Sequence, residues 1–446
     1  MAKDRDHACM WPYYPELLAR PVPRYTSYPT ALEFSGDTGP DDLAEALGET
    51  SGDLSIYVHI PFCERICWYC GCNTGAANRR ERLTSYLDAL RQEIALAGKL
   101  LGSGARVRRI SFGGGSPNAI TPVDFVRLVG DLTIHLPLAD PIWSIELDPR
   151  TLDSDWGRVI AGVGIQRASL GVQTLSPRLQ AAIGRVQPPA SIERAVDLLR
   201  EAGISSLNFD LMYGLPGQDR SDLEETIDSS ITLGADRVAL FGYAHVPARI
   251  PRQRKIDASN LPGPEERFHM AELGHNRLAA AGYVSVGFDH FALPFDPLAQ
   301  AAARKALRRN FQGFTDDAAP ALAGFGASAI SCFPDQIIQN EKNTGRYGMI
   351  LSQSRLPVAL GLRRDADDRL RGEIISGLLC HGEARIAPAM MAGAIEGIEK
   401  FRSYGLVEVQ RERLVILPDG LPYSRAIAAL FDAYLNGEPK RFSSAI

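Results

Sequence analysis

The sequence lacks several features that mark specialised classes of protein. It has no stretch of eighteen apolar residues without a charge, so no transmembrane helix is expected. Its 48 basic and 53 acidic residues give a formal charge of −5, which provides no bulk attraction to nucleic acid or to a membrane surface. The N-terminus has no apolar signal-peptide core. With 45% apolar residues over 446 positions, the chain is expected to be a globular, cytoplasmic, enzyme-sized protein.

Cysteines are few, and four of the seven lie within ten positions, at Cys63, Cys67, Cys70 and Cys72. A disulfide framework is not expected in a long chain without a secretion signal, which leaves metal or redox chemistry. A zinc site would need a second ligand pair, and no further C-x2-C or histidine pair follows. The C-x3-C-x2-C spacing suits a [4Fe-4S] cluster with one open iron. Packing as small buried hydrophobes is the alternative.

Short apolar runs alternate with amphipathic helices through the first two thirds of the chain. Strands are predicted at residues 55–60, 108–114, 143–149, 167–173, 206–214 and 237–245. Alternating strands and helices predict a parallel sheet with right-handed crossovers. Six such units fall short of a closed eightfold barrel. We therefore expect an α/β fold with an open, partial (β/α)6 barrel.

The sequence predicts three regions. Residues 1–50 form an extended N-terminal arm, 51–300 form the partial barrel with the cysteine loop, and 301–446 form a smaller, mostly helical C-terminal domain. In a barrel of this kind, functional residues collect at the carboxyl ends of the strands. The cysteine loop follows the first strand and the glycine-rich GGGSP follows the second, where a ligand can approach the backbone closely. A simple tight turn is the alternative interpretation of GGGSP.

Polar residues recur near the ends of the later strands. They are Glu146, Asp148, Gln173, Asp210, Tyr243 and His245. Any one of them alone is as well explained by solvation or capping. Their recurrence along one rim favours a polar site there.

The cysteine triad together with GGGSP resembles the radical S-adenosylmethionine (SAM) superfamily. More narrowly, the chain resembles the oxygen-independent coproporphyrinogen III dehydrogenases, also called anaerobic coproporphyrinogen oxidases, from about residue 12 to the C-terminus. The motifs that carry this resemblance are RYTSYPTALEFS (24–35), YVHIPFC…C..CGCN (57–73), IELDPR, LGVQ, FDLMYGLPGQ, YAHVP, DHFALP, RNFQGF and the terminal RFSSAI.

The resemblance implies that Cys63, Cys67 and Cys70 ligate the cluster and that SAM chelates the open iron, while Cys72 stays off the cluster. Reductive cleavage of SAM would give a 5′-deoxyadenosyl radical that abstracts hydrogen from a substrate propionate. Loss of CO2 and one electron would then leave a vinyl group, and two such rounds convert coproporphyrinogen III into protoporphyrinogen IX. Glu146 joins the three cysteines among the expected catalytic residues.

The resemblance also implies two bound SAM molecules. The first would be lined by Tyr57, Gly113, Glu146, Ala244 and Ile330, and the second by Tyr69, Gly114, Gly115, Gln173, Arg185 and Asp210. An acid can pair with the ammonium of SAM or accept from ribose hydroxyls, and an arginine can bind its carboxylate in a bidentate manner.

The implied partners are a tetrapyrrole substrate and an unidentified low-potential electron donor, with no nucleic acid and no membrane. The chain is expected to be a monomer. Because the substrate carries four carboxylates, cationic residues are expected near the barrel mouth. Arg24 in the arm and the stretch 304–311 are the candidates, and solvated surface is the alternative for both.

Six positions depart from the usual family text. Tyr69 stands in place of phenylalanine, Ser116 in place of threonine, Gly184 and Gly242 in place of asparagine, Leu293 in place of arginine, and Arg308 in place of histidine. These departures keep open a paralogue that acts on another substrate or a different radical reaction. A haem-trafficking chaperone is a further alternative, but such relatives typically lack CGC and RYTSYPT and carry HNxxYW where this chain has RNFQGF. The sequence therefore favours the enzyme.

Overall fold

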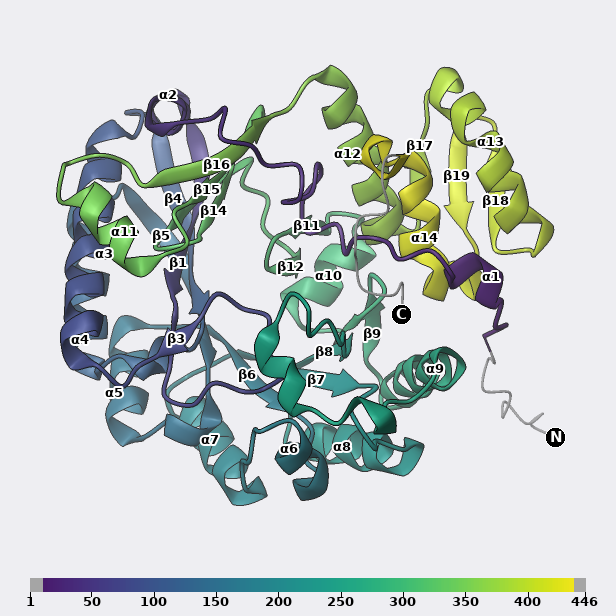
Figure 1. Ribbon diagram of the computed structural model, residues 1–446, viewed down its shortest axis with the longest axis horizontal. Coiled ribbons are helices and arrows are strands. Elements are labelled where there is room, and N and C mark those ends of the chain that lie inside the picture. Colours follow the sequence, from purple (N-terminus) through teal and green to yellow (C-terminus); the bar gives the residue numbers. More distant parts are fainter. Residues whose placement is uncertain (1–10, 437–446) are drawn as a thin grey trace.

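The computed structural model describes residues 11–436. Within this part of the chain, one twelve-stranded sheet curves through the centre of the larger lobe, and helices cover its outer side (Figure 1). The smaller lobe, yellow in Figure 1, is built from the C-terminal residues. No helix among the described residues is both long enough and apolar enough to cross a membrane.

The central strands of the sheet are parallel. Their order is β13 (Ala321–Phe325), β1 (Gly52–Ile60), β4 (Ala105–Gly114), β5 (Leu138–Leu147), β6 (Arg167–Gln173), β7 (Ser206–Tyr213) and β8 (Arg237–Gly242). Antiparallel strands extend both edges: β14 (Ile330–Cys332), β15 (Gln336–Asn340) and β16 (Val358–Arg363) beyond β13, and β10 (His290–Ala292) and β9 (Val284–Val286) beyond β8.

Helices connect the parallel strands on the outside of the sheet. They are α3 (Arg80–Leu100), α4 (Pro122–His135), α5 (Ser154–Val163), α6 (Pro177–Ala182), α7 (Pro189–Glu201) and α8 (Arg220–Thr232), and α9 (Pro264–Ala280) follows β8. Side chains of Thr121, Asp153 and Asp219 accept hydrogen bonds from the first turns of α4, α5 and α8, which fixes where these helices begin. The apolar faces pack on the strands to form the main core.

The six predicted strands correspond to β1 and β4 to β8, so the predicted α/β partial barrel is confirmed. The structure adds β13, which pairs in parallel with β1 from Leu54 with Ala321 to Val58 with Phe325. Because β13 and the antiparallel β14 to β16 belong to the same sheet, the barrel sheet runs past the predicted boundary at residue 300. Two short elements in this region, α10 (Pro297–Ala303) and α11 (Thr344–Leu351), accompany it.

The smaller lobe combines helices with a separate three-stranded sheet. Its elements are α12 (Ala366–His381), β17 (Glu383–Arg385), α13 (Pro388–Ser403), β18 (Val407–Gln410), β19 (Arg413–Ile416) and α14 (Ser424–Ala428). They enclose a second apolar core that also takes in Trp11, Leu17 and Tyr28 from the N-terminal arm.

The described part of the arm links the two lobes. In Figure 1 it runs from α1 (Pro15–Leu18), beside the yellow lobe, across the molecule to α2 (Pro40–Glu49). The Arg425 guanidinium donates to the carbonyl oxygens of Val22 (2.8 Å) and Pro23 (3.2 Å), and Arg309 donates to Tyr25 (3.2 Å). Residues 1–10 of the predicted arm and the terminal motif RFSSAI lie outside the described residues.

Candidate functional site at the carboxyl ends of the parallel strands

The cysteine loop leaves the carboxyl end of β1 and leads into α3, as predicted from the sequence. Its backbone folds back on itself through a short parallel bridge between β2 (Phe62–Cys63) and β3 (Gly75–Ala76). The Cys63 thiol lies 3.2 Å from the Thr74 hydroxyl, and the Cys67 carbonyl accepts from the Cys70 amide. The loop is therefore a compact turn that holds its three predicted cluster ligands on one side of the sheet.

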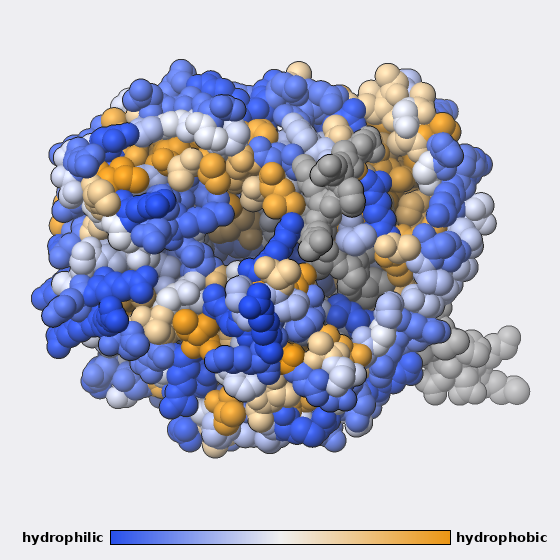
Figure 2. Space-filling model, in the orientation of Figure 1, coloured by the Kyte–Doolittle hydropathy of each residue, from blue (hydrophilic) through white to orange (hydrophobic). Residues whose placement is uncertain are grey.

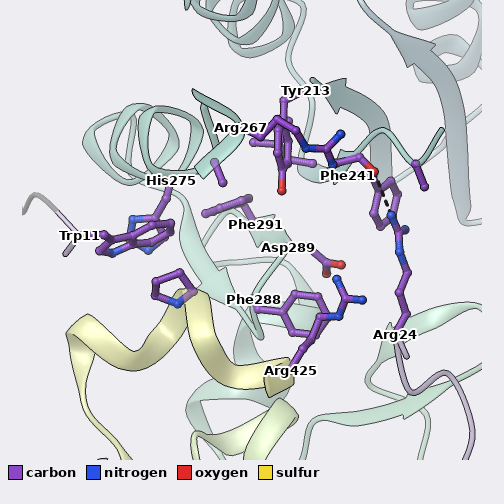
Figure 3. Close-up of a pocket in the computed structure, with 15 residues that line it drawn as sticks. Trp11, Arg24, Tyr213, Phe241, Arg267, His275, Phe288, Asp289, Phe291 and Arg425 are labelled. Atoms are coloured by element: carbon purple, nitrogen blue, oxygen red, sulfur yellow. Dashed lines mark hydrogen bonds between the residues drawn. The ribbon is translucent and has the colours of Figure 1, made fainter. Parts of the chain in front are cut away.

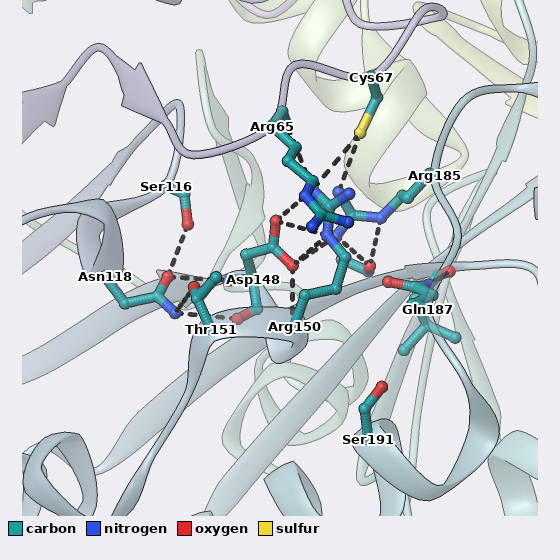
Figure 4. A network of polar contacts seen from close by, with 12 residues as sticks. Arg65, Cys67, Ser116, Asn118, Asp148, Arg150, Thr151, Arg185, Gln187 and Ser191 are labelled. Carbon is teal, nitrogen blue, oxygen red and sulfur yellow. Dashed lines mark hydrogen bonds and ion pairs between the residues drawn. The ribbon is translucent and has the colours of Figure 1, made fainter. Parts of the chain in front are cut away.

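Two arginines and one aspartate surround Cys67 (Figure 4). Arg185 donates to the Cys67 sulfur at 3.2 Å and Arg150 approaches the same sulfur at 3.8 Å. Asp148, at the end of β5, binds Arg150 through both carboxylate oxygens and lies 3.5 Å from Arg185. Arg150 also donates to the Arg65 carbonyl at 3.2 Å. The arrangement places two cations beside the buried Cys67 sulfur and ties the cysteine loop to the strand ends.

The residues of this network that sequence reasoning missed are informative. Asp148 was predicted only as one polar residue of the rim, and Arg150 was not singled out. Both belong to the same short IELDPR motif. Burial would raise the pKa of Asp148, but the hydrogen bonds that it accepts from Arg150 and the positive charge of Arg185 outweigh burial. The pKa of Asp148 is therefore lower than its ordinary value. The aspartate is therefore ionised and serves to orient both guanidiniums.

The three glycines of GGGSP each face another part of the site. A side chain at Gly113 would come within 2.7 Å of the Glu146 carboxyl group, and one at Gly115 within 2.5 Å of the Phe62 carbonyl oxygen. Gly114 has φ of +121°, a conformation that favours glycine. A side chain added at Gly114 would also come within 2.8 Å of the His59 ring. The run is thus required for close packing between β4, β5 and the cysteine loop. Its predicted contact with SAM stays a prediction.

Most residues predicted around the first SAM lie on neighbouring strands. Tyr57 on β1 pairs with Gly324 on β13, and a side chain at Gly324 would collide with the backbone of Ile330 on β14. The Glu146 carboxylate accepts from the Gly114 amide at 3.3 Å. These contacts bring Tyr57, Ile330 and Glu146 to one side of the sheet. Ala244 follows the carboxyl end of β8, the parallel strand furthest from β13 in the sheet, and lines a separate cavity.

The residues predicted around the second SAM gather beside the cysteine loop. The Arg185 guanidinium donates to the Gly171 carbonyl at 2.6 and 3.0 Å, and a side chain at Gly171 would contact both Arg185 and Gln173. Gln173, the last residue of β6, has φ of +67°, which is uncommon for a residue other than glycine and marks strain at this rim. The charge of Arg185 acts on Tyr69 and on Asp210. The structure thus places all four near one another.

An open cavity of about 280 Å³ lies inside the curved sheet. Glu146, Asp210 and Phe241 line it from the strands, and Phe314 lines it from a hairpin formed by β11 (Arg308–Asn310) and β12 (Gly313–Thr315). Figure 2 shows the face of the molecule hollowed near its centre, with hydrophobic residues along the upper border of the hollow. Two carboxylates therefore face a space that a bound molecule can enter.

Burial changes the titration of these two carboxylates. It raises the pKa of Glu146 to about 7, and the charge of Asp210 adds to the effect while the Gly114 amide opposes it. Burial also raises the pKa of Asp210, against hydrogen bonds from Asn208 and Ser169. The cavity thus places two buried carboxyls with raised pKa values, together with the guanidinium groups of Arg109, Arg167 and Arg237, around one space.

The donor set fits an iron–sulfur cluster better than a single metal ion. Among residues 11–436, no three cysteine, histidine or acidic side chains converge on a point sized for one ion. A [4Fe-4S] cluster instead takes one thiolate per iron, so its ligands stand apart from one another. Cys63, Cys67 and Cys70 lie on one loop, as the ligands of such a cluster would. Arg150 and Arg185 lie beside Cys67, where their positive charges would offset the negative charge of the cluster.

The departure at Gly184 has a structural partner in Trp68 of the cysteine loop. A side chain at Gly184 would lie 2.6 Å from the indole ring, and the Trp68 amide donates to the Ile183 carbonyl at 3.1 Å. Gly184 also has φ of +64°. The tryptophan therefore occupies the space in which an asparagine side chain would stand.

Gly184→Ala should destabilise the protein by about 2–4 kcal/mol, because it combines backbone strain with a clash against Trp68. Gly164→Ala is the matched control, since Gly164 has φ of +74° and nothing within 4 Å of an added side chain. Strain alone should cost that control about 1–2 kcal/mol. Urea unfolding of both variants measures the difference. Equal losses in the two variants would contradict the proposed packing, and Trp68→Ala should recover part of the loss in Gly184→Ala.

Comparison with known proteins bears directly on this site. The sequence pattern of the Radical SAM superfamily matches residues 57–229, which run from the second half of β1 through the cysteine loop to β7 and most of α8. The chain is 40% identical over 439 residues to the oxygen-independent coproporphyrinogen III oxidase of Bradyrhizobium diazoefficiens, covering 95% of this chain and 97% of that protein. It is 34% identical to the corresponding Escherichia coli protein, with 95% and 96% covered.

The fold agrees with these matches over nearly the whole chain. The solved structure of coproporphyrinogen III oxidase from Escherichia coli, described as a radical SAM enzyme, superimposes with a TM-score of 0.90 at 33% identity, covering 95% of this chain and all of that one. The similarity of fold thus extends over the same part of the chain as the similarity of sequence. On this combined agreement, the chain belongs to the oxygen-independent coproporphyrinogen III oxidase family.

Proposed function

We propose that the protein converts two propionate side chains of coproporphyrinogen III to vinyl groups, giving protoporphyrinogen IX by radical SAM chemistry. Each round removes one hydrogen atom from the propionate β-carbon, then CO2 and one further electron. The observation that carries the proposal is the similarity of 34–40% identity across 95% of the chain to proteins named for this activity. The comparisons give no support to the haem-chaperone alternative. As a member of the family, the protein uses a [4Fe-4S] cluster and SAM.

The chain's own residues would hold the cluster on the cysteine loop. Cys63, Cys67 and Cys70 would supply its three protein ligands, and Cys72 would remain outside the ligand set. When bound with SAM, the cluster supplies one-electron cleavage of the sulfonium and so a hydrogen-abstracting radical. Arg185 and Arg150 would place positive charge beside the Cys67 ligand, which favours binding of an anionic group at this position.

The proposed SAM contacts divide between the two groups of residues described above. Around the first SAM we propose Tyr57, Gly113, Glu146, Ala244 and Ile330, and around the second Tyr69, Gly114, Gly115, Gln173, Arg185 and Asp210. Glu146 faces the inner cavity and is suited to accept from the ammonium of SAM. Arg185 is suited to bind a carboxylate, but its guanidinium group already donates to the Cys67 sulfur and to the Gly171 carbonyl oxygen. A second SAM would therefore share this arginine with the cysteine loop.

Two departures from the family text lie away from the inner cavity. Leu293 packs against the main apolar core, and its amide donates to the Asp236 carbonyl. Arg308 is exposed at the start of the β11–β12 hairpin. Neither residue lines the cavity that holds Glu146 and Asp210. We infer that they leave the substrate class unchanged.

An anaerobic product assay tests the proposed function. Protein reconstituted with iron and sulfide, reductant, SAM and coproporphyrinogen III should give protoporphyrinogen IX, with methionine and 5′-deoxyadenosine formed alongside. A product with a different number of carboxyl groups would point to a paralogue with another substrate. Stable haem binding without turnover would instead favour the chaperone and overturn the proposal.

Binding of SAM should weaken at acidic pH if Glu146 accepts from its ammonium group. The pKa of Glu146 is about 7 before SAM binds, so below pH 7 a proton must leave before the pair can form. Affinity should then fall by up to about tenfold for each pH unit below 7. Equilibrium dialysis of labelled SAM against reconstituted protein measures this slope. Glu146→Gln should bind more weakly with a flatter pH profile, and an unchanged slope in that variant would contradict the assignment.

A further inference from the structure

A second cavity lies where β7 and β8 end, between the barrel, the N-terminal arm and the smaller lobe (Figure 3). Its volume is about 60 Å³, which is room for a few water molecules or one carboxylate group. Aromatic side chains form much of its wall, namely Trp11, Phe241, Phe288 and Phe291. It is distinct from the inner cavity that holds Glu146 and Asp210, although Phe241 lines both.

The charged residues of this cavity are mostly cationic. Arg24, Arg267 and Arg425 line it, and Asp289 is the one carboxylate among its described lining residues. The three arginines come from the arm, from α9 and from α14, segments far apart in the sequence. Figure 3 shows their guanidinium groups pointing toward the space around Tyr213 and Asp289. Burial raises the pKa of Tyr213, and the charges of Arg267, Arg24 and Arg425 oppose this rise.

Several contacts of these arginines are to neutral carbonyl oxygens. Arg24 donates to the Gly242 carbonyl at 3.0 Å, and Arg267 donates to the Tyr243 carbonyl at 2.5 Å. Gly242 makes this possible, because a side chain there would lie 2.9 Å from the Tyr213 hydroxyl and 3.1 Å from the Arg267 guanidinium. The absence of a side chain at Gly242 therefore leaves room for the cationic cluster beside the end of β8.

Asp289 interacts with His290 as well as with the charges of the arginines. Its carboxylate lies 2.5 Å from the His290 ring nitrogen, and that contact and its neighbours hold its pKa below the ordinary value despite burial. Burial and the charge of Arg24 lower the pKa of Arg425 to about 9, so Arg425 still carries its charge at neutral pH. Three guanidinium groups from separate segments of the chain thus line one small cavity.

We propose that Arg24, Arg267 and Arg425 form a binding subsite for a carboxylate group of the substrate. The proposal rests on the proposed function, and it identifies the place at which one propionate of the tetrapyrrole binds. Guanidinium groups bind carboxylates in a bidentate manner, and the aromatic wall suits the apolar ring that carries the propionate. The subsite shares Phe241 with the inner cavity and is itself lined by the predicted SAM contact Ala244, so a propionate bound here would orient the macrocycle toward the site of radical chemistry.

The arm gives the subsite a means of assembly. Arg24 belongs to the arm, whose backbone at Val22 and Pro23 is held by the Arg425 guanidinium. Arg309, from the stretch 304–311, donates to the carbonyls of Tyr25 and Arg24 and stacks on Phe314 with 4.4 Å to the ring centre. The sequence offered two cationic candidates, Arg24 and the stretch 304–311. Arg24 lines the cavity, whereas Arg309 of that stretch holds the backbone of the arm that carries Arg24.

The test compares substrate binding and turnover in Arg24→Ala, Arg24→Lys and Arg267→Gln. Arg24→Ala should raise the KM for coproporphyrinogen III about 10- to 100-fold and weaken binding of coproporphyrin III, the stable tetracarboxylate analogue, by a similar factor. Arg24→Lys keeps the charge but loses the bidentate fork, and should fall between Arg24→Ala and the unaltered protein. Raising the ionic strength should reduce the difference between the variants. Arg385→Ala is the matched control, because that side chain is 82% exposed in the smaller lobe.

A neutral probe separates charge recognition from a change of shape. The tetramethyl ester of coproporphyrin III should bind Arg24→Ala and the unaltered protein equally. The proposal is overturned if Arg24→Ala weakens the ester as much as the acid, or if it and Arg267→Gln both bind the acid with unaltered affinity. If the unaltered protein fails to convert coproporphyrinogen III, the proposed function fails. The acid and ester titrations still decide whether the subsite recognises carboxylates.

Discussion

Cys67→Ser should remove cluster iron from the anaerobically reconstituted protein and bring product formation below detection. Cys67 is buried, and two guanidinium groups point at its sulfur, so a serine hydroxyl there would offer neither the iron ligand nor the charge that the arginines accommodate. Cys63→Ser and Cys70→Ser should behave in the same way. Iron content, visible absorption and the anaerobic product assay measure the loss.

Cys72→Ser is the matched control for this prediction. Cys72 lies two residues from Cys70 but is exposed, and the proposed ligand set leaves it out. The variant should keep its iron and retain product formation. A Cys72→Ser protein without a cluster would contradict the three-ligand assignment. Thermal unfolding before reconstitution should be similar in all these variants, which separates loss of the cluster from loss of the fold.

Glu93→Ala should cost about 3–5 kcal/mol of stability, the largest effect we expect from a single change outside the site. Glu93 is fully enclosed on α3, the helix that follows the cysteine loop. Its carboxylate accepts from the Gly326 amide, the Asn340 side-chain amide and the Tyr347 hydroxyl. Without the Glu93 carboxylate, three buried donors lose this acceptor. The substitution also removes the hydrogen bonds that connect α3 to the residues that follow β13.

Urea unfolding measures this effect, with Gln92→Ala as the control. Gln92 is the exposed neighbour of Glu93 on the same helix, and its replacement should change stability by less than about 0.5 kcal/mol. Glu93→Gln should fall between the two, since its amide keeps one acceptor oxygen and introduces a donor where only acceptors are wanted. A Glu93→Ala protein as stable as the control would show that water or a rearranged loop satisfies the three donors.

Much of the barrel could be predicted from the sequence because its strands are long, apolar and separated by amphipathic helices. The predicted strands 167–173 and 206–214 match β6 and β7 almost residue for residue. β13 was missed because its five residues, ALAGF, form a short run with three small residues and no alternation of apolar and polar positions. Its place beside β1 depends on a parallel pairing across most of the chain, and no local pattern encodes such a pairing.

The site could be predicted only in part. The cysteines and the glycine run stand next to each other in short motifs, and the structure places both at the carboxyl ends of strands, where they were expected. The network around Cys67 joins Asp148 and Arg150, which follow β5, to Arg185, which lies in the connection after the next strand, β6. The arginine subsite combines three separate segments of the chain. Such sets are assembled by topology, so a reading of local spacing finds their members singly or not at all.

The place of β13 in the sheet also orders events during synthesis. The cysteine loop follows β1, yet one edge of β1 can pair with its neighbour, β13, only after residues 321–325 have been made. Until the ribosome has added residues 61–320, that edge offers free backbone groups to any other extended chain. A nascent or truncated polypeptide that stops short of residue 321 therefore carries its cysteines on an unfinished support. Iron delivery before the last third of the protein emerges would meet a loop that has not yet reached its final shape.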